Sequence, residues 1–363
     1  MTRPINPQMV TLARESRGLT QSELASRMGD RQAKVSKMES GLIGVTPDTL
    51  RSLSAAVDYP EEFFYQRDEL HGIDTSVLFH RRRQAISSRV LSKIHASVNI
   101  RRIHCQLLLK SVDLKPAKPF PRFDIVEFGD PAAVAQAVRA TWVLPRGPVA
   151  NVTKAIEDAG GIVFKCDFET RMIDAVSQWI AGHPPMFFVS DAIPGDRLRW
   201  TLAHEIGHVV MHRTVSPDIE DEADKFASNF LMPADEIRPY LAGGVAAGKL
   251  AELKPYWKVS MASLLKRAAD LGAIGERQAR YLWMQFGKAG YRTREPEYLD
   301  VPVEESSIFQ QLVAYHTGNL RFSVRDLASL LHLGEEELKE RYLRAREPRR
   351  LGKAAPTLRK VSK

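Results

Sequence analysis

The feature that most constrains this 363-residue chain is an H-E-x-x-H pattern at residues 204–208, inside a largely apolar stretch. On a helix, residues four apart lie on one face, so His204 and His208 can direct two imidazoles to one metal ion. Glu205 would lie beside that ion, where a carboxylate can take a proton from water. The surrounding residues predict a helix with Asp196 as its N-cap. The alternative is a buried helix with two hydrogen-bonded histidines.

A third metal ligand is expected from an acidic helix that follows. Catalytic zinc takes three protein ligands and keeps a fourth position open. Glu220 is the preferred ligand and Glu222 the rival, while Asp224, one turn after Glu220, could orient a zinc-binding histidine. His212 continues the histidine row but lies too far along the helix to bind the same ion. We expect His212 to have a supporting or structural role.

These residues carry a resemblance to a known family. R-W-T-L-A-H-E-I-G-H-V-V-M-H, followed by E-D-E-A-D-K-F-A and F-L-M-P, is similar to the ImmA/IrrE family of zinc metallopeptidases. The resemblance implies Zn²⁺ ligands at His204, His208 and Glu220, with Glu205 as the catalytic glutamate. It also implies a protein substrate, such as a helix-turn-helix repressor or an antitoxin, in a stress or mobile-element response. Because this chain also carries a helix-turn-helix domain of its own, described next, the chain itself is another expected substrate.

The N-terminal region predicts five short helices within residues 7–66, and Thr20 with Glu23 forms a capping box at the second helix. T-Q-S-E-L-A-S-R-M-G followed by V-S-K-M-E-S-G resembles the Xre/lambda-repressor helix-turn-helix family. In that family the third helix enters the major groove of duplex DNA. By the resemblance, the exposed residues of this helix are Gln32, Ala33, Lys34 and Lys37, and Gln21 would contact phosphate. The alternative is a protein-binding module of the same fold.

Charge is distributed unevenly along the chain. The net charge is +7 over residues 1–120, −7 over residues 121–340 and +8 over the last 23 residues. Basic ends beside an acidic middle favour a nucleic-acid partner, here a duplex DNA operator bound by a homodimer. We expect no membrane partner and a cytoplasmic location, because the chain shows neither a signal peptide nor a membrane-spanning run. Cys105 and Cys166 predict no disulfide framework and no metal knuckle.

The remaining segments predict connecting and packing elements. A basic cluster at 79–83 precedes a long helix at 88–110, and three strands are expected at 162–166, 173–180 and 186–189. Helices follow residue 233. The spacing of the leucines from Leu327 to Leu338 resembles a second helix-turn-helix pair, although packing helices are the preferred interpretation. No internal repeat stands out in the sequence.

The predicted fold class is α+β, mainly helical. Five regions are expected: a helix-turn-helix domain (1–67), a helical connector (68–119), a zincin-like peptidase domain with a small sheet (120–240), a helical region (241–345) and a disordered basic tail (346–363). The leading functional hypothesis is a DNA-binding regulator that also cleaves a regulatory protein in a zinc-dependent reaction. The alternative is a non-proteolytic regulator whose metal-binding domain senses a ligand or is structural.

Overall fold

The computed structural model describes residues 4–72, 86–212, 217–343 and 357–360, the last segment as backbone only. The described residues form two compact units. The first unit draws on residues 1–115, 168–172 and 308–363, and the second on residues 116–167 and 173–307. Helices predominate and the second unit contains one small sheet, which confirms the predicted fold class. Within the described ranges, no helix is long and apolar enough to cross a membrane.

The N-terminal helices follow the predicted order and their local signals. They are α1 (Pro7–Ser16), α2 (Gln21–Met28), α3 (Gln32–Glu39), α4 (Pro47–Val57) and a final 3₁₀ turn, η1 (Glu61–Tyr65). The Thr20 hydroxyl accepts from the Glu23 amide at 3.1 Å, while the Glu23 carboxylate accepts from the Thr20 amide at 2.7 Å. This reciprocal pair confirms the predicted capping box. Leu24 and Val35 are fully buried between the helices.

The first unit also contains a long helix and the C-terminal elements. These are α6 (Ser88–Leu109), α16 (Ile308–Gly318), α17 (Val324–Leu331), α18 (Glu335–Leu338) and a π-helical turn, η3 (Lys339–Leu343). Strand β1 (Val112–Lys115) pairs antiparallel with β5 (Thr357–Lys360), a segment that the sequence places in the basic tail. The basic cluster at 79–83 lies outside the described residues.

The second unit contains a three-stranded sheet in the order β2-β4-β3. Strand β2 (Ile162–Cys166) runs parallel to the central β4 (Met186–Ser190), and β3 (Ala175–Gln178) runs antiparallel to it. Every side chain of β3 and β4 is buried. The sheet therefore packs inside the unit, and β3 forms one of its edges.

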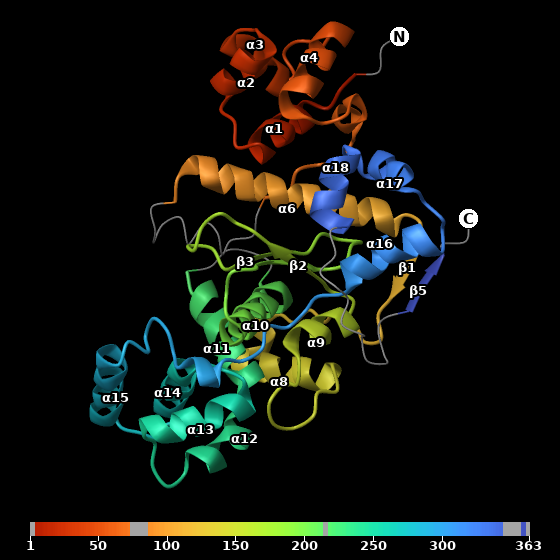
Figure 1. Cartoon of the computed structure of the whole chain (residues 1–363). Coiled ribbons are helices and arrows are strands. Elements are labelled where there is room, and N and C mark those ends of the chain that lie inside the picture. Colours follow the sequence, from red (N-terminus) through yellow and green to blue (C-terminus); the bar gives the residue numbers. More distant parts are fainter. Residues whose placement is uncertain (1–3, 73–85, 213–216, 344–356, 361–363) are drawn as a thin grey trace. The chain divides into compact units, whose positions relative to one another are not determined.

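Five helices flank this sheet in the chain: α7 (Ile125–Phe128), α8 (Pro131–Thr141), α9 (Val152–Asp158), α10 (Gly195–Met211) and α11 (Ile219–Leu231). Of these, α9 and α10 pack on the strands, and α10 carries the H-E-x-x-H pattern (Figure 1). Helix α10 contacts α8, α9, α11, β3 and β4. Such central packing explains why almost every residue of α10 is buried.

Four more α-helices and a short 3₁₀ helix complete the second unit. They are α12 (Ala234–Leu241), α13 (Ala247–Trp257), α14 (Met261–Asp270), α15 (Glu276–Lys288) and the short η2 (Glu297–Leu299). The segment after η2 crosses the start of α10, where a Cβ atom on Gly195 would overlap the carbonyl groups of Val301 and Pro302. Glycine is therefore required at this position by the close approach of two backbones.

Candidate metal centre

Two adjacent helices bring the predicted ligands together. His204 and His208 come from α10 and Glu220 comes from the first turn of α11. The ligand atoms of these three residues all lie within 4.8 Å of one another. The Nε2 atoms of the two histidines are 2.9 Å apart. The Glu220 carboxylate lies 3.6 Å from Nε2 of His204 and 3.5 Å from Nε2 of His208.

These separations fit a small tetrahedral ion. Nitrogen and oxygen ligands at zinc distances in a tetrahedron lie about 3.3–3.6 Å apart. The two separations from Glu220 fall within that range, and the two histidine nitrogens, at 2.9 Å, are closer together. Oε1 of Glu220 is also buried without a hydrogen-bond partner, and a buried acceptor of this kind is costly unless something satisfies it. The donor set and its spacing therefore match a His₂Glu zinc site.

Close packing at Gly207 allows the two helices to approach. A Cβ atom at this position would lie 3.1 Å from Cδ1 of Phe226 on α11. Phe226 is fully buried and stacks on Phe230 with the ring centroids 5.7 Å apart. The ring of Phe226 thus lies directly on the backbone of α10, between the two histidines of the pattern.

Asp224 orients the first histidine. Its Oδ1 atom lies 3.0 Å from Nδ1 of His204, and its Oδ2 atom lies 3.5 Å from Nζ of Lys266. A hydrogen bond at Nδ1 leaves Nε2 to face the other ligands. Burial lowers the pKa of His204, but the hydrogen bonds with Asp224 and Glu220 outweigh burial and raise this pKa to about 10. A metal ion at Nε2 therefore has to displace a proton.

Glu222 and His212 pair with each other beside the centre. Nε2 of His212 lies 3.0 Å from Oε2 of Glu222, and Nδ1 of His212 lies 3.1 Å from Nδ1 of His208. Glu222, the rival third ligand, therefore contacts His212 and not the pair of facing Nε2 atoms. This arrangement favours Glu220 as the third member of the cluster.

Glu205 lies on the buried side of α10, where it meets the sheet. Its Oε2 atom accepts a hydrogen bond of 2.6 Å from the hydroxyl of Ser177 on β3. Glu205 is 3% exposed and Ser177 is fully buried. Ser177 could not be identified from the sequence, because a single serine in a short strand has no motif around it. Only the packing of β3 against α10 brings the two side chains together.

Buried ion pairs fix the beginning of α10. Arg199 forms a hydrogen-bonded ion pair with Glu304, and the Glu304 carboxylate also accepts from the amides of Val152 and Thr153 at the start of α9. Arg197 also pairs with an acid, since it donates to Asp174 at 2.6 Å.

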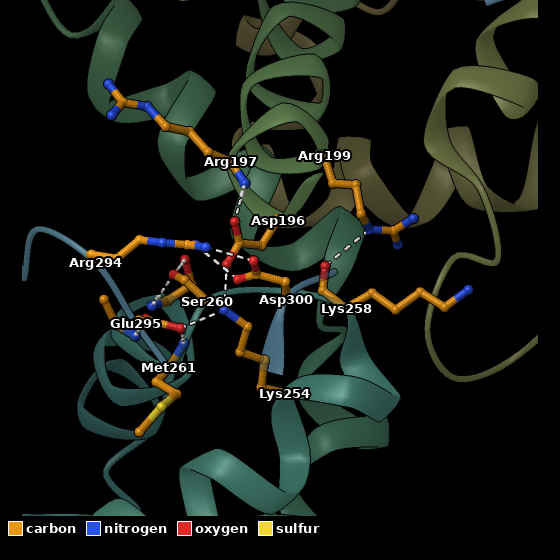
Figure 2. Close-up of polar contacts among 12 residues, drawn as sticks. Asp196, Arg197, Arg199, Lys254, Lys258, Ser260, Met261, Arg294, Glu295 and Asp300 are labelled. Atoms are coloured by element: carbon orange, nitrogen blue, oxygen red, sulfur yellow. Dashed lines mark hydrogen bonds and ion pairs between the residues drawn. The ribbon is translucent and has the colours of Figure 1, made fainter. Parts of the chain in front are cut away.

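A second buried pair corrects the predicted N-cap. The helix begins at Gly195 with Pro194 in the capping position, so the prediction of Asp196 as the N-cap was wrong. Figure 2 shows Asp196 pointing instead toward Lys254, whose Nζ lies 2.6 Å from Asp196 and 2.6 Å from Glu295. Lys254 is 1% exposed. Long-range pairing with a buried lysine thus prevailed over local capping.

The predicted DNA-contacting residues lie together on the surface of the first unit. Gln32, Ala33 and Lys37 are exposed on α3, while Lys34 is half-buried and pairs with Asp30. Nε2 of Gln32 donates to Gln21 at 2.7 Å, which links the start of α3 to the start of α2. This hydrogen bond therefore joins Gln21 of α2 to the predicted contact residues of α3.

Two known family models match the chain, one over the N-terminal helices and one over the helices of the metal cluster. A helix-turn-helix family model matches residues 11–64. A second model, the IrrE N-terminal-like domain of the M78 peptidases, matches residues 156–269. No curated protein matches the chain. The first match contains α2 and α3, and the second contains both helices of the metal cluster.

Proposed function

We propose that this chain, which joins a helix-turn-helix domain to a peptidase-family domain, is a cytoplasmic transcriptional regulator with a zinc-dependent endopeptidase activity. The observation that carries the proposal is the convergence of His204, His208 and Glu220, with Glu205 next to His204 in the chain and close enough to act on its charge. A purely structural zinc site takes four protein ligands and has no use for a base. The described cluster offers three ligands and a neighbouring carboxylate.

The residues have separable roles in this proposal. His204, His208 and Glu220 would hold the ion, and Asp224 would fix the ring of His204. Zinc bound there would supply a Lewis acid that polarises a peptide carbonyl and lowers the pKa of water. Glu205 would take a proton from the attacking water and pass it to the leaving amine. Ser177 would hold the Glu205 carboxylate in position through its hydrogen bond.

The proposed substrate is a regulatory protein, such as a repressor, an antitoxin or the chain itself. The link between the two activities is the DNA-binding domain, since a regulator bound at an operator meets other proteins that act there. A homodimer would match a two-fold operator with half-sites about one helical turn apart. Incubating the purified chain with zinc, alone and with proteins that copurify with it, tests for cleavage directly.

Zinc binding is tested by removing one ligand at a time. His208→Ala is expected to lose stoichiometric zinc, because two remaining ligands do not complete the site. Glu220→Gln should lose most of its zinc, whereas Glu222→Gln should keep it, since Glu222 contacts His212. Elemental analysis of dialysed protein measures all three. Full zinc in the His208 variant, or equal losses in the two glutamine variants, contradicts the assignment.

DNA binding is tested on α3. Lys34→Ala and Lys37→Ala should each weaken binding of duplex DNA and reduce the slope of log affinity against log salt by about 0.9 per lost phosphate contact. Gln32→Ala should relax base preference at one position, worth about 1–3 kcal/mol. Arg51→Ala on α4, which removes an exposed arginine paired with Asp48, is the matched control. Equal effects of the α3 and α4 variants in fluorescence anisotropy contradict the proposed DNA face.

A further inference from the structure

The C-terminal helices α17 and α18 repeat the geometry of α2 and α3. Residues 323–331 read S-V-R-D-L-A-S-L-L and residues 20–28 read T-Q-S-E-L-A-S-R-M. Both α17 and α2 are eight residues long, and both begin with a capping box, formed by Ser323 with Asp326 in α17. This repeat does not stand out in the sequence, because the two segments share few identical residues and lie far apart in the chain.

The turns after the two helices also correspond. Gly29 and His332, each nine residues after the capping residue, both adopt the left-handed conformation, with φ of 68° and 52°. The next amide bonds back to the helix in both cases, at 2.9 Å to Ala25 and at 3.0 Å to Ala328. The second helix then begins twelve residues after the cap, at Gln32 in α3 and at Glu335 in α18. The first buried residue of that helix is Val35 in α3 and Leu338 in α18.

The helix pair α17–α18 differs from α2–α3 in the charge of one face. The α3 residues proposed to contact DNA are Gln32, Ala33, Lys34 and Lys37. The residues at the corresponding positions are all glutamates: Glu335, Glu336, Glu337 and Glu340. Four carboxylates on this face would be repelled by the phosphates of DNA. A face of this charge suits a cationic protein surface instead.

The acidic face already holds an arginine of the DNA-binding domain. Arg17 follows α1, and its Nη1 and Nη2 atoms each lie 2.8 Å from one carboxylate oxygen of Glu337. The guanidinium also donates to the carbonyl groups of Val57 and Asp58 at 2.7 Å each and lies 4.3 Å from the ring centroid of Tyr59. Bidentate pairs of this kind are the more directional and stronger ion pairs.

We propose that α17 and α18 form a second helix-turn-helix unit that has an acidic face in place of a DNA-reading face, and that its partner is the DNA-binding domain of the same chain, held through Arg17. The unit thus binds protein where its N-terminal counterpart binds DNA. The comparison of faces rests on the proposed DNA contacts of α3, so the first test includes a direct check of those contacts.

Charge reversal tests the geometry in the full-length chain. Lys34→Ala combined with Lys37→Ala should lose binding to a random-sequence duplex, whereas Glu335→Lys, Glu336→Lys and Glu340→Lys, added together to that background, should restore it at least about tenfold with a steep salt dependence. The matched control replaces three exposed glutamates of the compact unit that contains the metal cluster by lysine: Glu252, Glu276 and Glu297. Equal gains in both triple variants overturn the proposal. If the Lys34→Ala, Lys37→Ala double variant binds duplex DNA as tightly as the unchanged chain, the proposed DNA contacts of α3 are wrong. The comparison between the two faces then has no basis, and the inference is overturned as well.

A double-mutant cycle tests the partner independently of DNA. Arg17→Ala and Glu337→Ala should each speed amide exchange at the end of α1 and in α18 by about tenfold. Because both changes break the same ion pair, the increase in the double variant should fall short of the product of the two single increases. Glu336→Ala, which removes a contact to Lys339 in the same helical segment, is the control and should leave α1 unchanged. Effects that multiply in the double variant, or an unchanged α1 in both single variants, overturn the assignment of Arg17 as the bound group.

Discussion

Replacing Glu205 by glutamine is expected to reduce peptide cleavage about 10²–10⁴-fold, the range contributed by a general base. The change keeps the size of the side chain and an oxygen that can still accept the hydrogen bond from Ser177. It removes only the ability to take up a proton. The variant should therefore retain its zinc, its DNA affinity and a melting temperature close to that of the unchanged chain.

The control for Glu205→Gln is a variant that loses another carboxylate of helices α10 and α11 but keeps Glu205. Glu222→Gln serves this purpose, because Glu222 contacts His212 at the side of the cluster. Cleavage of the chain itself or of copurifying proteins is followed by mass spectrometry, and regulation of the target promoter gives a second measurement. A Glu205→Gln variant that regulates normally, while the zinc-free His208→Ala variant fails, would favour a metal-sensing domain over a peptidase.

Replacing Lys254 by methionine is expected to destabilise the second unit by about 3–5 kcal/mol, as when one partner of a buried ion pair is removed. The change leaves the carboxylates of Asp196 and Glu295, which are 8% and 9% exposed, near each other without their shared cation. Burial lowers the pKa of Lys254, but hydrogen bonds to the two acids outweigh burial and raise it. The ammonium group is therefore present at neutral pH, and its contribution is lost only as the pH rises above the ordinary lysine range.

Urea unfolding followed by tryptophan fluorescence measures this loss, since Trp257 is fully buried three residues after Lys254. Lys249→Met is the control on the same helix, because Lys249 is partly exposed and only 3.8 Å from Glu252 in a surface pair. Pairs of that kind contribute about 0–1 kcal/mol. Similar unfolding midpoints for the two variants would mean that the buried lysine does not secure the start of α10.

Local sequence signals predicted the helix-turn-helix region and the three strands of the second unit. Thr20 and Glu23 form the capping box expected at the start of α2. The pairing of His204 with His208 followed from helical spacing alone. Each of these features depends on residues a few positions apart, which is why the sequence is sufficient for them.

Features that depend on packing between distant segments could not be predicted. The choice between Glu220 and Glu222 depends on how α11 turns toward α10, and both glutamates lie in the same first turn. Ser177 and Glu304 reach α10 from 28 and 105 residues away in the chain. The spacing of residues along α10 carries no information about such partners.

Gly207 has a consequence for recognising related H-E-x-x-H helices from sequence. The H-E-x-x-H pattern treats the residue before the second histidine as free, but the packing described above does not. A methyl group there would press on the ring of Phe226, which would have to shift by a few tenths of an ångström. Chains that keep all three ligands but have a bulky residue at this position should therefore carry a smaller side chain than phenylalanine at the facing position of the next helix. A sequence search that considers the positions of Gly207 and Phe226 together would distinguish helix pairs that can pack closely enough to bind one ion from helices that only contain the H-E-x-x-H pattern.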